Sequence, residues 1–477
     1  MQAAIRMAQE MAQLLGAGPL LLRALPPQQE HRPMNTGIVW LRNSFRLDDQ
    51  PLLAQAAREC DELLIVADSA AGVRAGVHRE RFHAQSLAEF DAALRRRGQW
   101  LYLMAEDPVD WLPKLAAILD ARSVFVNDLP GSEEASQIER LGQSLPQDCG
   151  LNVGRDNRLF DGLFDDPRLD RAAWPMSFSA FRRKVENRLE PAPPVDAPGA
   201  LPPPPGIVPA TEPLQAPGPS GLLVGGERAG RDRLVDYVFR RRLVTRYKET
   251  RNGMLSADDS TRFSPWLANG CLSARRVWSE VERFEAEVEA NESTYWVKFE
   301  LLWREYFRWL MDATGNALFQ SSGLGDAAPE SRPDPTRLQA WRDGKTGVPL
   351  VDAAMRELSE TGYTSNRARQ NAASFLVKDL QQDWREGAAW FEHQLVDYDV
   401  ASNWGNWAYQ AGTGTDTKDR WFNVIGQARR YDPDAEYLGR WLPELRDLDP
   451  AERFMPWKAA TPVAGYPPPV VEDARWS

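Results

Sequence analysis

The sequence has few cysteines and histidines for its length. Three cysteines and four histidines stand among 477 residues, and none of them has the spacing of a CxxC or Cys/His metal motif. The sequence therefore predicts no disulfide framework, and no metal ligands are expected. Cys60, Cys149 and Cys271 are interpreted as small buried hydrophobic residues. This cysteine usage is typical of a reducing compartment, and we expect a cytoplasmic location.

Long apolar runs and a glycine-rich phosphate loop are also missing. No run approaches the ~20 apolar residues that span a bilayer, so no membrane partner is expected. No GxGxxG pattern marks a dinucleotide site. The hydrophobic fraction of 43% excludes a disordered chain. The amphipathic first 33 residues hold Glu10 and Glu30 and no serine, which argues against a transit peptide.

A strongly basic composition is absent as well. The net charge is −11, which on average repels nucleic acid, so DNA binding would need a local basic face. Candidates for such a face are Arg240–Arg251, Arg275 with Arg276, and Arg429 with Arg430. The alternative is that these charges form ordinary solvated helix faces.

Short apolar runs alternate with amphipathic stretches from Gly37 to about Asp161. The runs GIVWL, ELLIVAD, WLYLM and SVFVN are separated by helical patterns such as RERFHAQSLAEFDAALRRRG. Strands that alternate with helices at this spacing indicate a parallel sheet covered on both faces. We therefore predict an α/β, doubly wound domain over residues 35–165.

A proline-rich segment follows, and the pattern then changes. Twelve of the 29 residues from Pro191 to Pro219 are proline, which predicts a linker rather than a helix or strand. Past Gly225 the apolar residues recur with a period of 3.6, which predicts an all-α domain. The predicted divisions are residues 1–34 for an N-terminal extension, 166–224 for a connector, 225–450 for the helical domain and 451–477 for a C-terminal tail.

The most informative stretch runs from Thr361 to Tyr409. It places Arg, Asp and Asn among tryptophans inside a predicted helical core. Fixed charges in such a core are costly unless they are paired or used on a charged ligand. We therefore expect these Arg, Asp and Asn residues to bind a cofactor.

With the segments before it, this stretch resembles the photolyase and cryptochrome flavoproteins, and within them the cryptochrome DASH group. The resemblance rests on Tyr247–Val277, Ser293–Leu310, Ser365–Leu380 and Asp397–Gly412. It covers most of the chain from Gly37 to about Leu445. It implies an N-terminal antenna domain, a helical domain that binds FAD and DNA, and a monomer.

The resemblance implies a set of flavin-binding residues. Those expected around the diphosphate are Tyr247, Ser260, Thr261, Arg262, Phe263 and Ser264. Those expected at the ring and ribose are Asn366, Arg369, Asp397, Asp399 and Asn403, with Asn403 facing the flavin N5. Two plain alternatives remain open: a Ser/Thr cap on the helix that follows, and a structural Arg369–Asp397 salt bridge.

Electron supply is a further implication of the resemblance. Relatives reduce their flavin through three tryptophans, and here the first two match Trp407 and Trp384. The third position falls on Ser331, which cannot be oxidised by a tryptophan radical. Trp341, Trp390 and Trp421 are candidates for a substitute. Simple packing remains the default interpretation for most of the 18 tryptophans.

The resemblance also implies a pocket for an extruded pyrimidine dimer. Its expected residues are Glu300, Trp303, Arg304, Tyr363, Arg367 and Gln370. Glu300 would donate a hydrogen bond or proton to the thymine edge, and Trp303 would stack on a base or simply pack between helices. Tyr363 stands where duplex-repairing relatives have Trp, and Gln370 where they have Met. This more polar pocket is similar to that of the DASH group, whose members repair dimers in single strands.

Three functions are weighed. The first is blue-light-driven, FAD-dependent repair of cyclobutane pyrimidine dimers, preferentially in single-stranded DNA, with catalytic residues Glu300, Asn403, Trp407 and Trp384. The second is a non-enzymatic blue-light photoreceptor, and the third a general single-strand-binding protein. A (6-4) photoproduct enzyme is disfavoured because none of the four histidines falls in the pocket motifs. A methenyltetrahydrofolate antenna near Leu129 is left open, since Ser132 and Glu133 also fit the start of a capped helix.

Overall fold

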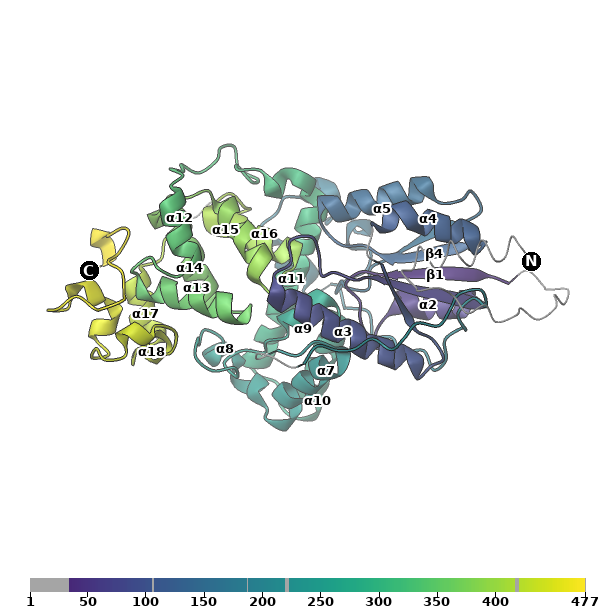
Figure 1. Ribbon diagram of the computed structural model, residues 1–477, viewed down its shortest axis with the longest axis horizontal. Coiled ribbons are helices and arrows are strands. Elements are labelled where there is room, and N and C mark those ends of the chain that lie inside the picture. The colour runs from purple at the N-terminus through teal and green to yellow at the C-terminus, as the bar shows by residue number, and fades with distance from the viewer. Residues whose placement is uncertain (1–33, 105–106, 187, 219–222, 417–419, 477) are drawn as a thin grey trace.

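The computed structural model describes residues 34–104, 107–186, 188–218, 223–416 and 420–476. The predicted N-terminal extension, residues 1–34, lies outside these ranges apart from Met34. Figure 1 shows a sheet-containing part and a helical part arranged along the long axis of the molecule.

The first part is a parallel sheet whose strands are joined by helices. Its strands are β1 (Thr36–Leu41), β2 (Glu62–Asp68), β3 (Leu101–Met104), β4 (Ser123–Asn127) and β5 (Gly150–Gly154). All neighbouring strands are parallel, in the order β3-β2-β1-β4-β5. The connecting helices are α2 (Pro51–Glu59), α3 (Val77–Arg95), α4 (Pro108–Ile118) and α5 (Ser132–Ser144). The predicted doubly wound α/β fold is confirmed.

The two faces of the sheet belong to two different cores. Successive side chains of a strand point to opposite faces. Ile38 and Trp40 of β1 therefore pack with Trp111 of α4 in one core, whereas Val39 and Leu41 face the other way. This second core continues without a break into the helical part of the molecule.

The second part is all helical within the described residues, as predicted. Its helices are α6 (Phe178–Val185), α7 (Glu227–Val235), α8 (Tyr247–Thr250), α9 (Ser264–Asn269), α10 (Ala274–Glu287), α11 (Glu292–Thr314), α12 (Pro335–Arg342), α13 (Pro349–Thr361), α14 (Asn366–Ser374), α15 (Trp384–Gln394), α16 (Val400–Ala411), α17 (Val424–Tyr431) and α18 (Glu436–Trp441). Helices α15 and α16 pack against each other, and α11 packs against α16.

Two helical stretches are interrupted where the sequence pattern predicts continuity. Each ends in a π-helical turn, Asp236–Arg240 after α7 and Phe375–Asp379 after α14. Arg242 and Gln381 then adopt left-handed backbone conformations, with φ of 52° and 53°. A left-handed residue cannot continue a right-handed helix, so the chain changes direction there and α15 starts afresh at Trp384.

The proline-rich segment lies against the first part. Residues 188–218 contain no helix or strand, and they are held by polar contacts instead. The Val195 amide donates to Asp49 Oδ1 at 3.0 Å, the Leu214 amide donates to Asp91 Oδ2 at 3.1 Å, and Arg95 donates to the Thr211 carbonyl at 2.8 Å. The segment is therefore fixed along the surface of the α/β part.

Buried ion pairs join the two parts. Asp49, which follows β1 and is fully buried, accepts hydrogen bonds from Arg275 Nε at 3.1 Å and Nη2 at 3.0 Å. Arg276 binds Asp48 in the same way, at 2.8 and 2.7 Å. Arg275 and Arg276 were candidates for an exposed basic face, and that prediction is wrong. Both guanidinium groups are committed to carboxylates of the first part.

Ser273 serves the same junction and the start of α10. Its hydroxyl accepts from the Arg276 amide at 3.2 Å as an N-cap and donates to Asp49. We expect Ser273→Ala to lower the free energy of unfolding by about 1–2 kcal/mol, since both the cap and the contact to a buried carboxylate are lost. Urea unfolding measures this loss. Ser177→Ala, which removes the N-cap of α6, is the matched control, and an equal loss in both variants would contradict the expectation.

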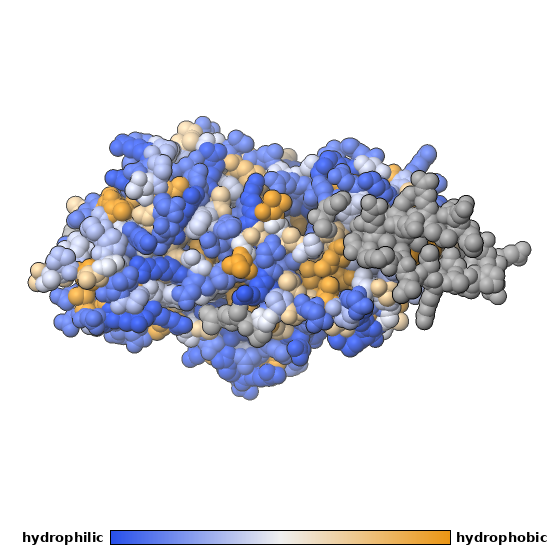
Figure 2. Space-filling view, viewed as in Figure 1, coloured by the Kyte–Doolittle hydropathy of each residue, from blue (hydrophilic) through white to orange (hydrophobic). Residues whose placement is uncertain are grey.

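In the described part of the chain, no helix has both the length and the apolar composition that a bilayer crossing requires. Figure 2 shows a face that is mostly hydrophilic, with hydrophobic groups at several places on it.

Candidate active site

A cavity of about 510 Å³ opens in the helical part between α11, α14, α15 and α16. The structure brings ten of the predicted site residues to its wall. They are Glu300, Trp303, Arg304, Asn366, Arg369, Gln370, Asp397, Asp399, Asn403 and Trp407. These residues come from segments that lie up to about a hundred positions apart in the sequence, so their convergence is a property of the fold.

The other predicted site residues do not line this cavity. They are Tyr247, Ser260, Thr261, Arg262, Phe263, Ser264, Tyr363, Arg367 and Trp384. Tyr363 is buried, and its ring has the guanidinium groups of Arg262 and Arg369 each 5.1 Å from its centroid. Tyr363 thus supports Arg369, which does reach the cavity.

An ion pair crosses one side of the cavity. Arg369 Nη2 donates to both oxygens of Asp397, at 3.0 and 2.9 Å, and Arg369 Nε donates to the Thr364 carbonyl at 2.9 Å. Ser264 Oγ donates to Asp397 Oδ2 at 2.6 Å. Burial lowers the pKa of the Arg369 guanidinium, but the charge and hydrogen bond of Asp397, with Tyr363 and Glu357 nearby, together raise the pKa overall. The pair is charged and holds α14 to the start of α9.

The start of α9 is the segment predicted to meet the flavin diphosphate. No side chain caps this helix, and Phe263 occupies the N-cap position. The plain alternative, a Ser/Thr cap, is therefore not what the structure contains. Ser264 instead turns its hydroxyl to Asp397.

Asp399 is a second fixed negative charge at the cavity. It caps α16 by accepting from the Ser402 amide at 2.9 Å, and it forms an ion pair with Arg308 of α11. Burial would raise the pKa of Asp399, yet the charges of Arg308 and Arg304 and the Ser402 amide lower it to about 2. Asp399 therefore accepts hydrogen bonds and does not donate them at neutral pH.

Glu300 also lines the cavity but has a different environment. Its carboxylate pairs with Arg251, which also lies over the Trp296 ring, 4.5 Å from its centroid. Removal from bulk water raises the pKa of Glu300, and Arg251 only partly offsets this effect. The cavity thus holds one carboxyl group that stays ionised and another that is protonated more readily.

Aromatic rings line the same wall as Glu300. Trp303 stacks on Phe178, with centroids 3.7 Å apart and an interplanar angle of 10°, and it meets the edge of Tyr409 at 5.6 Å. The Arg420 guanidinium lies 3.7 Å from the centroid of Tyr409. The wall therefore offers flat apolar surface beside a cation, which suits a base and its phosphate.

Basic side chains gather beside this cavity. Arg367 donates to Asn252 Oδ1 at 2.7 Å and lies over the Tyr431 ring, 4.5 Å from its centroid. Burial lowers the pKa of Arg367, and the nearby charges of Arg251 and Arg430 lower it further. Arg251 and Arg430 belong to two of the predicted basic candidates, so part of the expected basic face is present here.

The family "DNA photolyase" matches residues 37–200, and the family "FAD binding domain of DNA photolyase" matches residues 296–476. A cryptochrome DASH from Natronomonas pharaonis is 40% identical over 474 residues, which cover 93% of this chain and 99% of that protein. The chain belongs to the cryptochrome DASH group of the photolyase and cryptochrome family.

Solved structures of the family agree with the fold. The crystal structure of a Synechocystis cryptochrome has a TM-score of 0.85 and 38% identity, over 93% of this chain and 98% of that one. An archaeal photolyase from Sulfolobus tokodaii, described with two FAD molecules and a novel light-harvesting cofactor, has a TM-score of 0.73 and 26% identity, over 92% and 96%. The helical part of this chain is therefore an FAD-binding domain.

The cavity fits a flavin on its own features. Gln370 Oε1 is buried and has no hydrogen-bond partner, although this residue lines the cavity. Buried polar atoms are normally satisfied, so an atom of this kind at a cavity marks a place for a ligand. Asn403, whose amide donates to the Ala388 carbonyl at 3.0 Å, and the Arg369–Asp397 pair line the cavity together with Phe391 and Trp407.

Several lining residues escaped the sequence analysis. They are Arg251, Trp296, Phe299, Phe307, Ala373, Phe391, Leu395, Tyr398, Ser402, Asn406, Gln410 and Arg420. Arg308, the partner of Asp399, was missed as well. One signal could have found it, because Arg304 and Arg308 lie one helical turn apart among aromatic residues of α11. Arg304 itself donates to the Asn157 and Leu267 carbonyls, at 2.9 and 3.3 Å.

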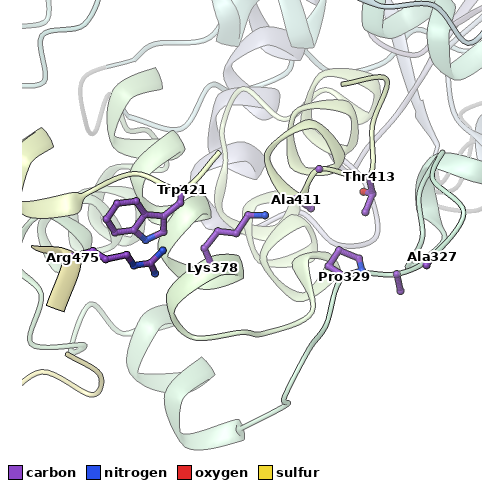
Figure 3. A pocket seen from close by; sticks show the side chains of 9 residues that line it. Ala327, Pro329, Lys378, Ala411, Thr413, Trp421 and Arg475 are labelled. Carbon is purple, nitrogen blue, oxygen red and sulfur yellow. The ribbon is translucent and has the colours of Figure 1, made fainter. Parts of the chain in front are cut away.

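A second pocket, of about 420 Å³, lies elsewhere on the helical part. Figure 3 shows Lys378, Trp421 and Arg475 along it, with Ala411 and Thr413 on another side. None of the predicted flavin or substrate residues lines it. The Arg475 guanidinium lies 4.1 Å from the centroid of Trp421, so this tryptophan packs beneath a cation.

Proposed function

We propose that this chain uses blue light and reduced FAD to split cyclobutane pyrimidine dimers, preferentially in single-stranded DNA. The observation that carries the proposal is the cavity itself. The charged residues expected at the flavin line the same cavity as Glu300 and Trp303, which suit a pyrimidine pair. Bound reduced FAD would supply the electron upon excitation, and the protein supplies position and charge.

Arg369 and Asp397 would lie beside the flavin ring in this proposal. A guanidinium group held by two hydrogen bonds to a buried carboxylate cannot lose its proton at physiological pH. It places a fixed positive charge where a reduced flavin ring carries negative charge. Asn403 would face N5, and Asp399 would accept hydrogen bonds from the ribose edge.

Glu300 and Trp303 would contact the dimer. Negative charge develops on the thymine carbonyl when the pyrimidine pair accepts an electron, and a protonated carboxyl group at that atom stabilises the charge. Trp303 presents one face to the cavity because Phe178 covers the other. A base could stack on that free face.

The preference for single strands follows from the polar character of the pocket. Extrusion of a dinucleotide from a duplex costs a few kcal/mol, and binding of the dinucleotide in the pocket must offset this cost. Gln370 and Tyr363 stand where the duplex-repairing relatives have Met and Trp, and Gln370 and Tyr409 line the cavity with polar groups. A single strand avoids the unpairing cost, and the weaker pocket suffices for it.

A histidine-based reaction has little support in the described structure. His78, His83 and His393 contact the backbone carbonyls of Ser359, Asp68 and Arg74, and none of them lines the cavity. His31 lies outside the described residues.

The deciding experiment is repair of a thymine dimer by the chemically reduced, FAD-loaded protein under blue light. The dimer is placed in a single-stranded oligonucleotide and in the matching duplex, and dark samples serve as controls. We expect repair in the single strand and little in the duplex. Equal repair of the single strand and the duplex would indicate a general dimer photolyase. Repair of neither substrate would favour the photoreceptor function.

The role of Glu300 predicts a pH dependence. Because its pKa is raised by burial, the protonated form persists to higher pH than in water and disappears as the pH rises through that pKa. We expect repair of single strands to fall over the same range. Glu300→Gln donates a hydrogen bond at every pH and should flatten the profile, whereas Glu300→Ala should lower the repair quantum yield about tenfold, the value of one hydrogen bond of ~1.4 kcal/mol. An unchanged profile in the Gln variant would contradict this role.

A folate antenna is proposed for the first part. Ligands of doubly wound sheets bind at the carboxyl ends of the strands, where the strand order reverses, here between β1 and β4. Arg42 lies at this edge and donates to Gln137 Oε1 of α5 at 2.7 Å. Helix α5 begins at Ser132, but Gly131 is its N-cap and no side chain caps it, so the capped helix of the plain alternative is not present. An intense near-ultraviolet absorbance band beyond that of flavin, in the purified protein, would support the antenna, and its absence would contradict it.

A further inference from the structure

The electron route predicted from the family is incomplete in this chain. Trp407 lines the cavity, and Trp384 begins α15, the helix that packs against the helix of Trp407. Ser331 occupies the third position, is exposed, and lies in an irregular segment before α12. Its side chain cannot supply an electron. The inference below rests on the proposed flavin photochemistry and concerns the residue that replaces this donor.

Trp404 is the tryptophan in ring contact with Trp384. The two ring centroids are 5.8 Å apart, with the planes at 76°. Trp404 lies on α16, one turn before Trp407. Trp384 is 2% exposed, whereas Trp404 is only partly buried. The contact therefore leads from the core towards the surface, as a terminal donor requires.

Trp404 also has a proton acceptor. Its Nε1–H donates to Glu392 Oε2 at 3.4 Å. The Tyr398 hydroxyl also forms a hydrogen bond with the Trp404 side chain. Glu392 is held in place by Arg74 at 3.3 Å. An indole that has lost an electron becomes a far stronger acid at N–H, so a carboxylate at this atom can take the proton. Loss of that proton traps the radical, because return of the electron alone no longer restores the indole.

Trp384 and Trp341 have a backbone carbonyl, and not a carboxylate, at their ring nitrogen. Trp384 donates to the Ser321 carbonyl at 3.0 Å, and Trp341 donates to the Ala372 carbonyl at 3.0 Å. A backbone carbonyl is a very weak base. Trp341 does contact Trp407, with centroids 6.2 Å apart, but it is fully buried. An electron hole on Trp341 would have neither a base nor solvent to stabilise it.

The other two candidates from the sequence, Trp390 and Trp421, each have an arginine guanidinium group over the indole ring. The Arg342 guanidinium is 5.3 Å from the centroid of Trp390, and Arg475 is 4.1 Å from that of Trp421 (Figure 3). A fixed positive charge over a ring opposes formation of a second positive charge on it. Trp421 does have Asp379 at its Nε1, at 3.1 Å, so it is the strongest competitor and must be tested directly.

We propose that Trp404 is the terminal electron donor of this chain and that Glu392 is its proton acceptor. Bound oxidised FAD would be the electron acceptor after excitation. Trp407 would donate one electron, Trp384 would replace the electron lost by Trp407, and Trp404 would replace the electron lost by Trp384. The Nε1–H proton of Trp404 passes to the Glu392 carboxylate. A thiol of the medium later returns one electron and one proton to Trp404, and Glu392 releases its proton to water.

Flash excitation of the FAD-loaded, oxidised protein tests the proposal. Transient absorption follows the tryptophan radical, and time-resolved electron paramagnetic resonance identifies the ring that carries it. We expect Trp404→Phe to lose the long-lived neutral radical, with recombination from Trp384 instead. Glu392→Gln should still form the radical, but in its cationic form. Trp390→Phe is the matched control and should leave the radical unchanged.

Two outcomes would overturn the proposal. One is a radical in Trp404→Phe with the lifetime and spectrum of the parent protein. The other is loss of the radical in Trp421→Phe but not in Trp404→Phe, which would assign the role to the second pocket. The flavin spectrum and the unfolding temperature of each variant show that the cavity is intact. Dimer repair by the chemically reduced parent protein tests the proposed function separately, because it needs no electron from the tryptophans.

Discussion

Asp397→Ala is expected to bind FAD at least about a hundredfold more weakly than the parent protein, corresponding to ~2.7 kcal/mol. Asp397 is 2% exposed at its side chain, and its removal leaves the Arg369 guanidinium in the cavity wall without its counter-charge. An uncompensated buried charge typically costs about 3–5 kcal/mol. The protein can lower this cost only by moving Arg369 or admitting water, and either change alters the flavin-binding wall.

Asp397→Ala also removes a contact that holds the start of α9. Ser264 donates to Asp397 at the start of α9, the segment expected to meet the flavin diphosphate. One carboxylate therefore orients both the residue beside the ring and the residues at the phosphates. For this reason we expect the loss of affinity to exceed that of a single hydrogen bond.

Fluorescence titration of the apoprotein with FAD measures the affinity, and the absorbance ratio of purified protein reports its flavin content. Asp383→Ala is the matched control, because Asp383 forms a partly exposed pair with Arg385 at 2.6 Å, and such pairs contribute about 0–1 kcal/mol. The control should bind FAD as the parent does. Full flavin content and unchanged affinity in Asp397→Ala would refute the role of the pair in cofactor binding.

The double variant Gln370→Met with Tyr409→Trp is expected to gain repair of duplex DNA by about 30- to 100-fold. Stacking of a base on an aromatic ring contributes about 1–3 kcal/mol, and a larger ring at position 409 extends the surface already offered by Trp303. The Gln370 carbonyl oxygen is buried without a partner. Its replacement by a thioether removes a polar group whose desolvation costs about 1–3 kcal/mol. Together these gains match the few kcal/mol needed to unpair a dimer from a duplex.

Initial rates of repair on the two substrates measure the effect within one protein. Repair of the single strand should change by less than about threefold, since no unpairing cost limits it. The Arg420 guanidinium, which lies over Tyr409, can stack on the larger indole ring as well. If duplex repair stayed at the parent level while FAD binding was normal, the polarity of the pocket would not be the source of the substrate preference.

The fold could be predicted from the sequence where burial imposes a clear pattern. The strands β1 to β4 are apolar runs between helical stretches, and they were found. β5 was missed because its sequence, GLNVG, has only two large apolar residues, and the strand is partly exposed at the edge of the sheet. The breaks after α7 and α14 were missed for another reason. The apolar period continues through the π-helical turns, and the left-handed residues Arg242 and Gln381 are not glycine.

The site could be predicted in part because charges among tryptophans are unusual in themselves. The sequence does not show which charged residues form ion pairs with each other. Asp49 and Arg275 are separated by 226 positions. The sequence around Arg275 therefore does not show whether the basic start of this helix binds carboxylates of the other part or faces DNA. The same limit hid Arg251 and Arg308, whose partners Glu300 and Asp399 were predicted. It also hid Trp404, since ring contacts between α15 and α16 depend on how these helices pack.

The unbroken core between the sheet and the helices limits how this chain can be divided or recombined. A fragment that ended near residue 218 would keep all five strands, yet its Asp48 and Asp49 carboxylates would lose the arginines that neutralise them. Chimaeras that exchange this fragment between relatives would have to carry the matching arginines along with it. The α/β part and the helical part of such a protein are therefore constrained to change together, even though their topologies are independent.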